Sequence, residues 1–217
     1  PSHLASLLPI TTITSDYQEI IEADVYIVSV SDDAIAEVTA QLPFENRLVV
    51  HTSGSSTLSV VHSKNRAGVF YPLQTFTKGK SIDFTTIPIC LEAENELDYA
   101  LLTTLGSALS QTVLTIDSEQ RKSLHVTAVF VCNFVNHLYE IGAEICEKND
   151  VPFEILHPLI QETAHKITER SPREAQTGPA LRNDTKTITQ HLDFLENSTY
   201  QNIYQILTQS IQHVKKL

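Results

Sequence analysis

The pattern of hydrophobic and polar positions changes about halfway along the chain. Up to residue 116, short runs rich in valine, isoleucine and threonine alternate with amphipathic segments; the runs lie at 11–14, 24–30, 47–51, 67–72, 87–93 and 111–116. Runs that are apolar on both faces and separated by helices are typical of a mostly parallel sheet covered by helices on both sides. Residues 1–116 are therefore predicted to form a doubly wound, Rossmann-like α/β domain.

Beyond Ile116 the pattern is helical throughout. Asp117 is a good N-cap with Gln120 three residues later, and it opens a predicted helix over 118–148. Pro152 starts another helix, which Pro158 should kink, and Asp184 caps a third before a last helix from residue 198. Residues 117–217 are therefore predicted to form an all-α domain that contributes the substrate side of a site and a dimerisation surface.

Composition excludes several classes of function. With 15 Lys and Arg against 26 Asp and Glu, the net charge is −11 and no basic run is present, so nucleic acid and anionic membranes are excluded as partners. The apolar stretch 124–146 is long enough to cross a bilayer, but its histidines, asparagines and glutamates favour a buried helix instead. Three widely spaced cysteines suit buried thiols in a reducing compartment, so we expect a cytoplasmic protein.

Polar residues follow two of the predicted strands directly. Ligands of open α/β sheets bind at the carboxyl ends of the strands, where hydroxyls and backbone N–H groups suit a phosphate or ribose. For residues 51–56, which follow the strand predicted at 47–51, the alternative is a turn in which Ser53, Ser55 or Thr57 caps the next helix and Gly54 supplies unusual backbone angles. The candidate cofactor-binding residues are Ser29, Val30, Ser31, His51, Thr52, Ser53 and Gly54.

Further candidates lie on the predicted long helix, after a strand and in a late loop. At about 100° per residue, His125 shares one helix face with a lysine and two asparagines; histidine suits a general acid, and an amide can hold a carbonyl or hydroxyl. The alternatives are core polar groups on the helix, simple packing at the strand end and a surface ion pair in the loop. We predict His125, Asn133 and Lys122 as catalytic, and Tyr71, Gln74, Asn136, Thr177 and Arg182 as substrate-binding. The remaining histidines show no metal-ligand spacing, so no metal is expected.

Four segments together resemble a known family: HTSGSS (51–56), GVFYPLQTF (68–76), DSEQRKSLHVTAVFVCNFVNHLYE (117–140) and TGPALRNDTKTITQHLDFL (177–195). They are similar to Rossmann-like proteins whose helical half is known as domain of unknown function 2520, distant relatives of pyrroline-5-carboxylate reductase and the 6-phosphogluconate dehydrogenase-like hydroxyacid dehydrogenases. In the related dehydrogenases, a helix of this kind presents a lysine and an asparagine to the substrate. The sequence departs from the family in one respect: the G-x-G-x-x-G turn of the first βα unit is missing, so by its motifs the chain is expected to start beyond the second strand.

The resemblance implies a nicotinamide dinucleotide, NADP or NAD, as cofactor. It implies an oxidoreductase that transfers hydride to or from a small carbonyl, imine or alcohol in the cleft between the domains, and a homodimer formed through the long apolar helices. The alternative is a non-catalytic nucleotide-binding or regulatory protein that retains the fold.

Overall fold

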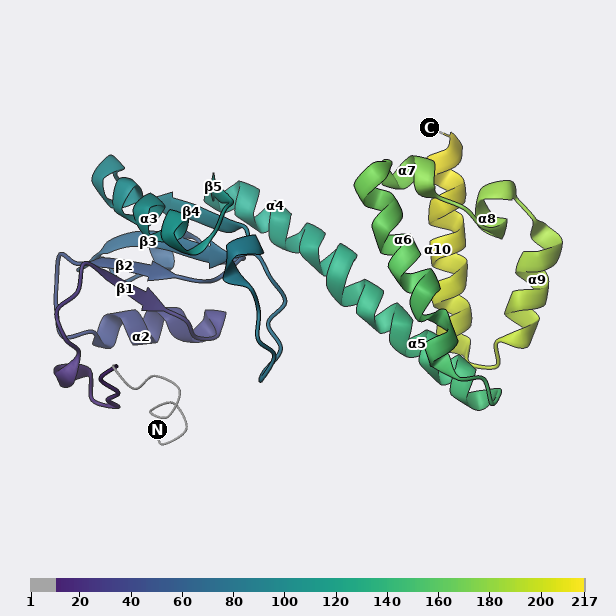
Figure 1. The fold of residues 1–217 in the computed structure, drawn as a ribbon, viewed down its shortest axis with the longest axis horizontal. Coiled ribbons are helices and arrows are strands. Elements are labelled where there is room, and N and C mark those ends of the chain that lie inside the picture. The colour runs from purple at the N-terminus through teal and green to yellow at the C-terminus, as the bar shows by residue number, and fades with distance from the viewer. Residues whose placement is uncertain (1–10, 217) are drawn as a thin grey trace. The chain divides into compact units, whose positions relative to one another are not determined.

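The computed structural model describes residues 11–216, which form two compact units. The sheet unit extends to Phe134 and the helical unit runs from Val135 to the C-terminus (Figure 1). The division lies further along the chain than the boundary expected near residues 116–118, because the helix that follows the last strand makes its contacts with the sheet.

The sheet unit contains five strands in sequential order: β1 (Val25–Val28), β2 (Leu48–His51), β3 (Arg66–Pro72), β4 (Ile89–Ala93) and β5 (Val113–Thr115). The first three strands are parallel, β4 runs antiparallel to β3, and β5 runs parallel to β4. The predicted mostly parallel sheet is confirmed. The expected strand at 11–14 is wrong: these residues are largely exposed and form no strand, and a short 3-10 helix, η1 (Tyr17–Glu19), follows instead.

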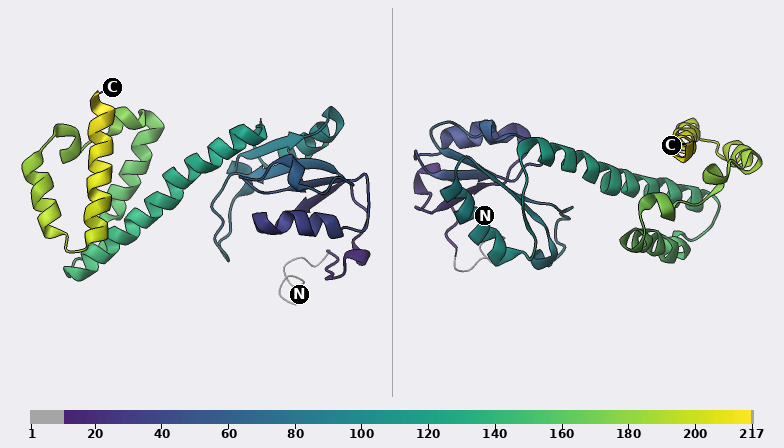
Figure 2. Two further views of the ribbon diagram at one scale, coloured as in Figure 1. Left: turned by 180° about the vertical axis from the view of Figure 1, so that it is seen from behind. Right: turned by 90° about the horizontal axis from the view of Figure 1, so that it is seen from above.

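Helices cover both faces of the sheet. In Figure 1, α2 (Ile35–Gln41) and α3 (Glu96–Leu109) lie on opposite sides of the strands, and Figure 2 shows the same arrangement from behind. Alternate residues of β2 separate two cores: Leu48 and Val50 pack toward Leu102 of α3, whereas Val49 packs in the cluster that Val38 of α2 borders. Strands that are apolar on both faces thus produce the doubly wound arrangement. Three 3-10 turns complete the sheet unit: η2 (Asp32–Ala34), η3 (Leu58–Val60) and η4 (Phe84–Thr86).

The predicted long helix is continuous from residue 118 to residue 148, with one irregular segment. It comprises α4 (Ser118–Ala128), a π-helical stretch η5 (Val129–Phe134) and α5 (Val135–Lys148). Asp117 and Gln120 form the expected capping box, since each side chain accepts a hydrogen bond from the other residue's backbone N–H at 2.8 and 3.1 Å.

The helical unit continues with η6 (Phe153–Leu156), α6 (His157–Glu169), α7 (Pro172–Ala175), α8 (Pro179–Arg182), α9 (Thr185–Phe194) and α10 (Ser198–Lys216). Asp184 caps α9 as expected, accepting from the backbone N–H of Thr187 at 3.1 Å. The kink expected at Pro158 is wrong: this proline lies in the first turn of α6, where a missing backbone N–H costs nothing.

Candidate active site

A cavity of about 610 Å³ lies in the sheet unit at the carboxyl ends of the parallel strands. Because β1, β2 and β3 run in the same direction, the residues that follow them meet at one edge. Seven predicted site residues line this cavity together: Ser29, Thr52, Ser53, Gly54, Tyr71, Gln74 and His125. Asp32 and the aromatic rings of Phe70, Phe76 and Phe84 complete much of its wall.

His125 and Tyr71 meet directly in this cavity. The Tyr71 hydroxyl lies 3.4 Å from Nδ1 of His125, across 54 residues of sequence. Burial raises the pKa of the Tyr71 phenol, so the hydroxyl stays protonated at neutral pH. The pair therefore combines an imidazole and a neutral phenol, two groups that can exchange a proton with a ligand.

Gly54 lies against this pair. A Cβ atom at this position would lie 2.6 Å from Nδ1 of His125 and 2.9 Å from the Tyr71 ring, so no other residue fits without moving these groups. The expectation that Gly54 supplies unusual backbone angles is wrong, because the positive φ angles among described glycines are those of Gly79 and Gly178. The glycine is needed here for space.

The segment 51–57, called the serine loop below, is held by its own hydrogen bonds. The Ser53 hydroxyl oxygen accepts from the backbone N–H groups of Ser55 and Ser56 at 3.1 and 3.0 Å. The predicted helix cap is wrong. Thr57 directly precedes η3, but its side chain makes no capping hydrogen bond. The Ser53 hydroxyl instead bonds to backbone N–H groups within the turn.

His51 stabilises the same loop through both of its ring nitrogens. Its side chain is fully buried, Nδ1 accepts from the backbone N–H of Ser53 at 3.2 Å, and Nε2 lies 3.3 Å from the Thr57 carbonyl. This arrangement places the proton on Nε2. Burial, followed by the charge of Arg121, lowers the pKa of His51 and keeps the ring neutral. Both ring nitrogens are engaged, and His51 does not line the cavity.

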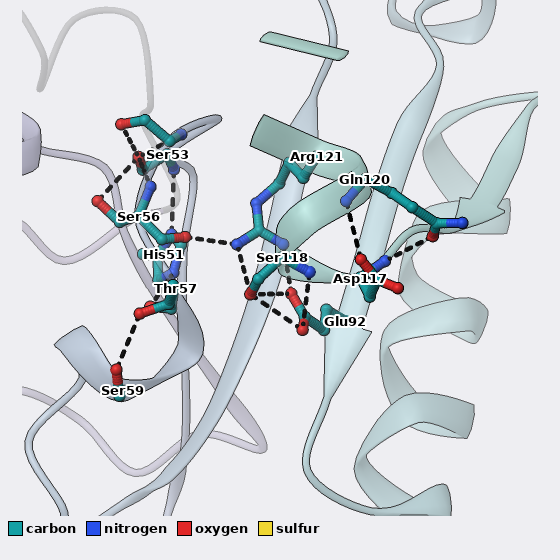
Figure 3. A network of polar contacts seen from close by, with 11 residues as sticks. His51, Ser53, Ser56, Thr57, Ser59, Glu92, Asp117, Ser118, Gln120 and Arg121 are labelled. Atoms are coloured by element: carbon teal, nitrogen blue, oxygen red, sulfur yellow. Dashed lines mark hydrogen bonds and ion pairs between the residues drawn. The ribbon is translucent and has the colours of Figure 1, made fainter. Parts of the chain in front are cut away.

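Arg121 is a residue that the sequence reasoning missed (Figure 3). Its side chain is 1% exposed; Nη1 forms an ion pair with Glu92, and Nη2 donates to the Ser56 carbonyl and, at 3.3 Å, to the Ser118 hydroxyl. Nε is the one buried side-chain nitrogen or oxygen without a partner in the part of the chain that the structure describes. A sequence signal exists: a cation in the first turn of a helix opposes the helix dipole, so it needs a specific acceptor.

The other predicted residues lie elsewhere. Val30 and Ser31 are exposed after β1 and do not line the cavity. Lys122 and Asn133 are exposed in the sheet unit, while the helical unit contains Asn136, Thr177 and Arg182, also exposed. The shared helix face was predicted from α-helical geometry, which is interrupted by the π-helical stretch η5; this stretch contains Asn133 and precedes Asn136.

No three His, Cys, Asp or Glu side chains among residues 11–216 gather so that they could hold a metal ion. In the same range, none of the helices combines the length and the apolar character that a membrane span needs. The cysteines are unpaired; Cys90 is buried as expected, whereas the expectation of a buried thiol is wrong for Cys132, which is exposed.

Comparisons with known proteins identify relatives of the whole chain. The family model described as a domain of unknown function, DUF2520, matches residues 87–211. A Bacteroides fragilis protein, named as a candidate NADP oxidoreductase, is 43% identical with a TM-score of 0.89, over 98% of this chain and 84% of that chain. No curated protein matches the sequence.

Two more distant structures share the fold. 1-Pyrroline-5-carboxylate reductase from Streptococcus pyogenes has 14% identity and a TM-score of 0.61, over 100% of this chain and 85% of that chain. An imine reductase from Myxococcus stipitatus in complex with NADP⁺ has 13% identity and a TM-score of 0.51, over 89% and 74%. The expected likeness to pyrroline-5-carboxylate reductase is confirmed at the level of the fold.

Proposed function

The chain belongs to the family of domain of unknown function 2520, and from this premise we propose that it is an NAD(P)-dependent oxidoreductase. The observation that carries the proposal is the meeting of His125, Tyr71 and Gly54 in one cavity at the strand ends. This is the edge at which open α/β sheets bind nucleotides. The name of the Bacteroides fragilis relative and the NADP⁺ complex of the imine reductase support the choice of cofactor, NADP or NAD.

The residues at this edge fit the nicotinamide half of such a cofactor. Hydroxyls of Ser29 and Thr52, 3.4 Å apart, can bind ribose or amide groups, and Gly54 leaves space that a side chain would fill. Residues 1–217 contain no G-x-G-x-x-G turn of the kind that binds a pyrophosphate. When bound, the nicotinamide would supply or accept a hydride.

The protein's own part in the reaction is to move a proton. Reduction of a carbonyl or imine carbon by hydride leaves a negative charge on the oxygen or nitrogen, which takes up a proton; oxidation of an alcohol reverses both transfers. Tyr71 can donate this proton, and His125, in contact with its hydroxyl, can replace it. Lys122 and Asn133 stay predicted catalytic residues, and Gln74, Asn136, Thr177 and Arg182 stay predicted substrate contacts.

The substrate is proposed to be a small carbonyl, imine or alcohol. Phe70, Phe76 and Phe84 add apolar surface to a cavity that also has polar lining residues, which suits a compact molecule with one polar reactive group.

We propose further that the protein is a cytoplasmic homodimer. In the helical unit, Ile141, Ala180 and Thr208 are the described residues that are buried, whereas large apolar side chains such as Ile155, Leu159 and Ile206 are more than 60% exposed. Apolar exposure on this scale favours burial against a second copy. Light scattering is expected to give twice 24.2 kDa; a monomer mass would contradict the dimer.

Alanine substitution at His125 and at Asn133 tests catalysis. NADPH oxidation is followed with a panel of small aldehydes, ketones and cyclic imines, and circular dichroism checks folding. A loss of about 100-fold or more in H125A with the fold intact supports an acid–base role. If the wild-type protein binds NADPH but turns over no member of the panel, the non-catalytic alternative is favoured.

A further inference from the structure

We propose that Arg121 is the positioning residue of this site: it ties the serine loop to helix α4 and so keeps Gly54 against His125. The inference deepens the proposed function and rests on it for its catalytic meaning. Arg121 does not line the cavity, so it touches neither cofactor nor substrate there and acts through the residues that it holds.

The guanidinium joins three separate parts of the sheet unit. It extends from α4, pairs with Glu92 on β4 and donates to the Ser56 carbonyl of the serine loop (Figure 3). Its partners lie 29 and 65 residues earlier in the chain. The planar guanidinium presents its donors to the two acceptors in fixed directions, whereas the ammonium of lysine is a compact charge on a flexible stem whose donors rotate.

Glu92 fixes the other side of this junction. Its carboxylate accepts from the Ser118 backbone N–H at 3.1 Å and from the Ser118 hydroxyl at 2.9 Å, so it also binds the first turn of α4. Its side chain is 16% exposed, against 1% for Arg121. The helix therefore begins at a fixed point on β4, and this point determines where His125, one turn beyond Arg121, is placed.

The loop brings Gly54 to the same place. One end is braced by His51 and the middle by Ser53, while Arg121 holds the Ser56 carbonyl. Between these anchors Gly54 has no free space toward Nδ1 of His125. If Ser56 is released, the backbone around Gly54 loses its link to the helix that carries His125.

Nuclear magnetic resonance tests this positioning without a substrate. The readouts are the Gly54 amide signal and the His125 ring signals, assigned with the H125Q variant. R121M removes the fork and the charge, whereas R121K keeps the charge but replaces the rigid fork between Glu92 and Ser56 by a flexible ammonium. The matched control is R66M, because Arg66 makes a bidentate pair with Asp98 of α3 in the same unit, at 2.8 and 3.0 Å.

We expect both Arg121 variants to shift the Gly54 and His125 signals, and R66M to leave them in place. The pKa of His51 is expected to rise in R121M, because the guanidinium charge contributes to lowering it, and to stay near the wild-type value in R121K. If R121M does not fold, R121K decides the question alone.

The proposal is overturned if folded R121K and R121M keep both signals at their wild-type positions, or if R66M shifts them as far. Calorimetric titration of NADPH into the wild-type protein and R121K accompanies the spectra. Absence of binding by the wild-type protein contradicts the proposed function, while the spectra still decide whether Arg121 positions the loop.

Discussion

Replacing Gly54 by alanine places a methyl group in space that His125 and Tyr71 already occupy. The Cβ atom would lie 2.6 Å from Nδ1 of His125 and 2.9 Å from Cζ and the hydroxyl oxygen of Tyr71. Since heavy atoms pack at about 3.5 Å, the imidazole would have to retreat by about 0.9 Å. The His125–Tyr71 contact, at 3.4 Å, is already long for a hydrogen bond, so further separation breaks it.

The magnitude follows from this displacement. Moving a reacting group by about 1 Å costs on the order of 100-fold in rate, and overpacking of this kind costs about 1–3 kcal/mol in the free energy of unfolding. G54A is therefore expected to fold, with turnover lowered by about 100-fold. Urea unfolding is followed by circular dichroism, because the chain contains no tryptophan, and turnover by NADPH oxidation.

Gly79 provides the matched control. Its φ is +81° and a Cβ atom added there would have no atom within 4 Å, so G79A strains the backbone at a cost of about 1 kcal/mol without entering the cavity. G79A should retain wild-type turnover. The reasoning is refuted if folded G54A turns over as fast as the wild-type protein, or if G79A loses as much activity.

Three further predictions concern proton transfer and pH. Y71F keeps the ring but removes the donor, so turnover should fall about 100-fold with NADPH affinity unchanged; a wild-type rate would exclude Tyr71 as the donor. Because burial, and then the charge of Arg121, lowers the pKa of His51, the unfolded chain binds a proton that the native loop rejects. The free energy of unfolding should be undiminished above about pH 6.5 and fall below it, by at most about 1.4 kcal/mol per pH unit; urea unfolding of H51Q should lack this slope, and equal slopes in both proteins would contradict it. Hydrogen bonds from Arg66 lower the pKa of Asp98, so its contribution is present above about pH 3.8 and lost as the pH falls below that value; acid unfolding of D98N should lack this component, and an unchanged acid profile would count against the pair.

Much of the fold follows from local sequence patterns. Apolar runs predicted the strands, and Asp117 with Gln120 predicted where the long helix starts, because a capping box acts within one turn. The strand expected at 11–14 failed because β propensity needs a buried face, which these residues lack. The kink predicted at Pro158 was wrong because a proline kinks a helix only in its interior, whereas it is favoured in the first turn, where Pro158 lies.

The site was predicted only in part, because the contacts that were missed join residues far apart in the sequence. Strand-end positions and the polar face of the helix predicted Gly54, Tyr71 and His125, which do meet. Sequence alone could not show that Gly54 is required for space, since the atoms that exclude a methyl group come from residues 71 and 125. Arg121 was missed for the same reason: its two main partners lie far earlier in the chain, and burial is a property of the folded unit.

Calorimetric titration of NADPH and NADH into the full-length protein tests the central claim most directly. The account predicts binding of one of them at about micromolar Kd, retained in G79A and lost in G54V, whose larger side chain enters the cavity beside His125 and Tyr71. If neither dinucleotide binds the wild-type protein, or if G54V binds as tightly, the proposed cofactor site at the ends of these strands is wrong.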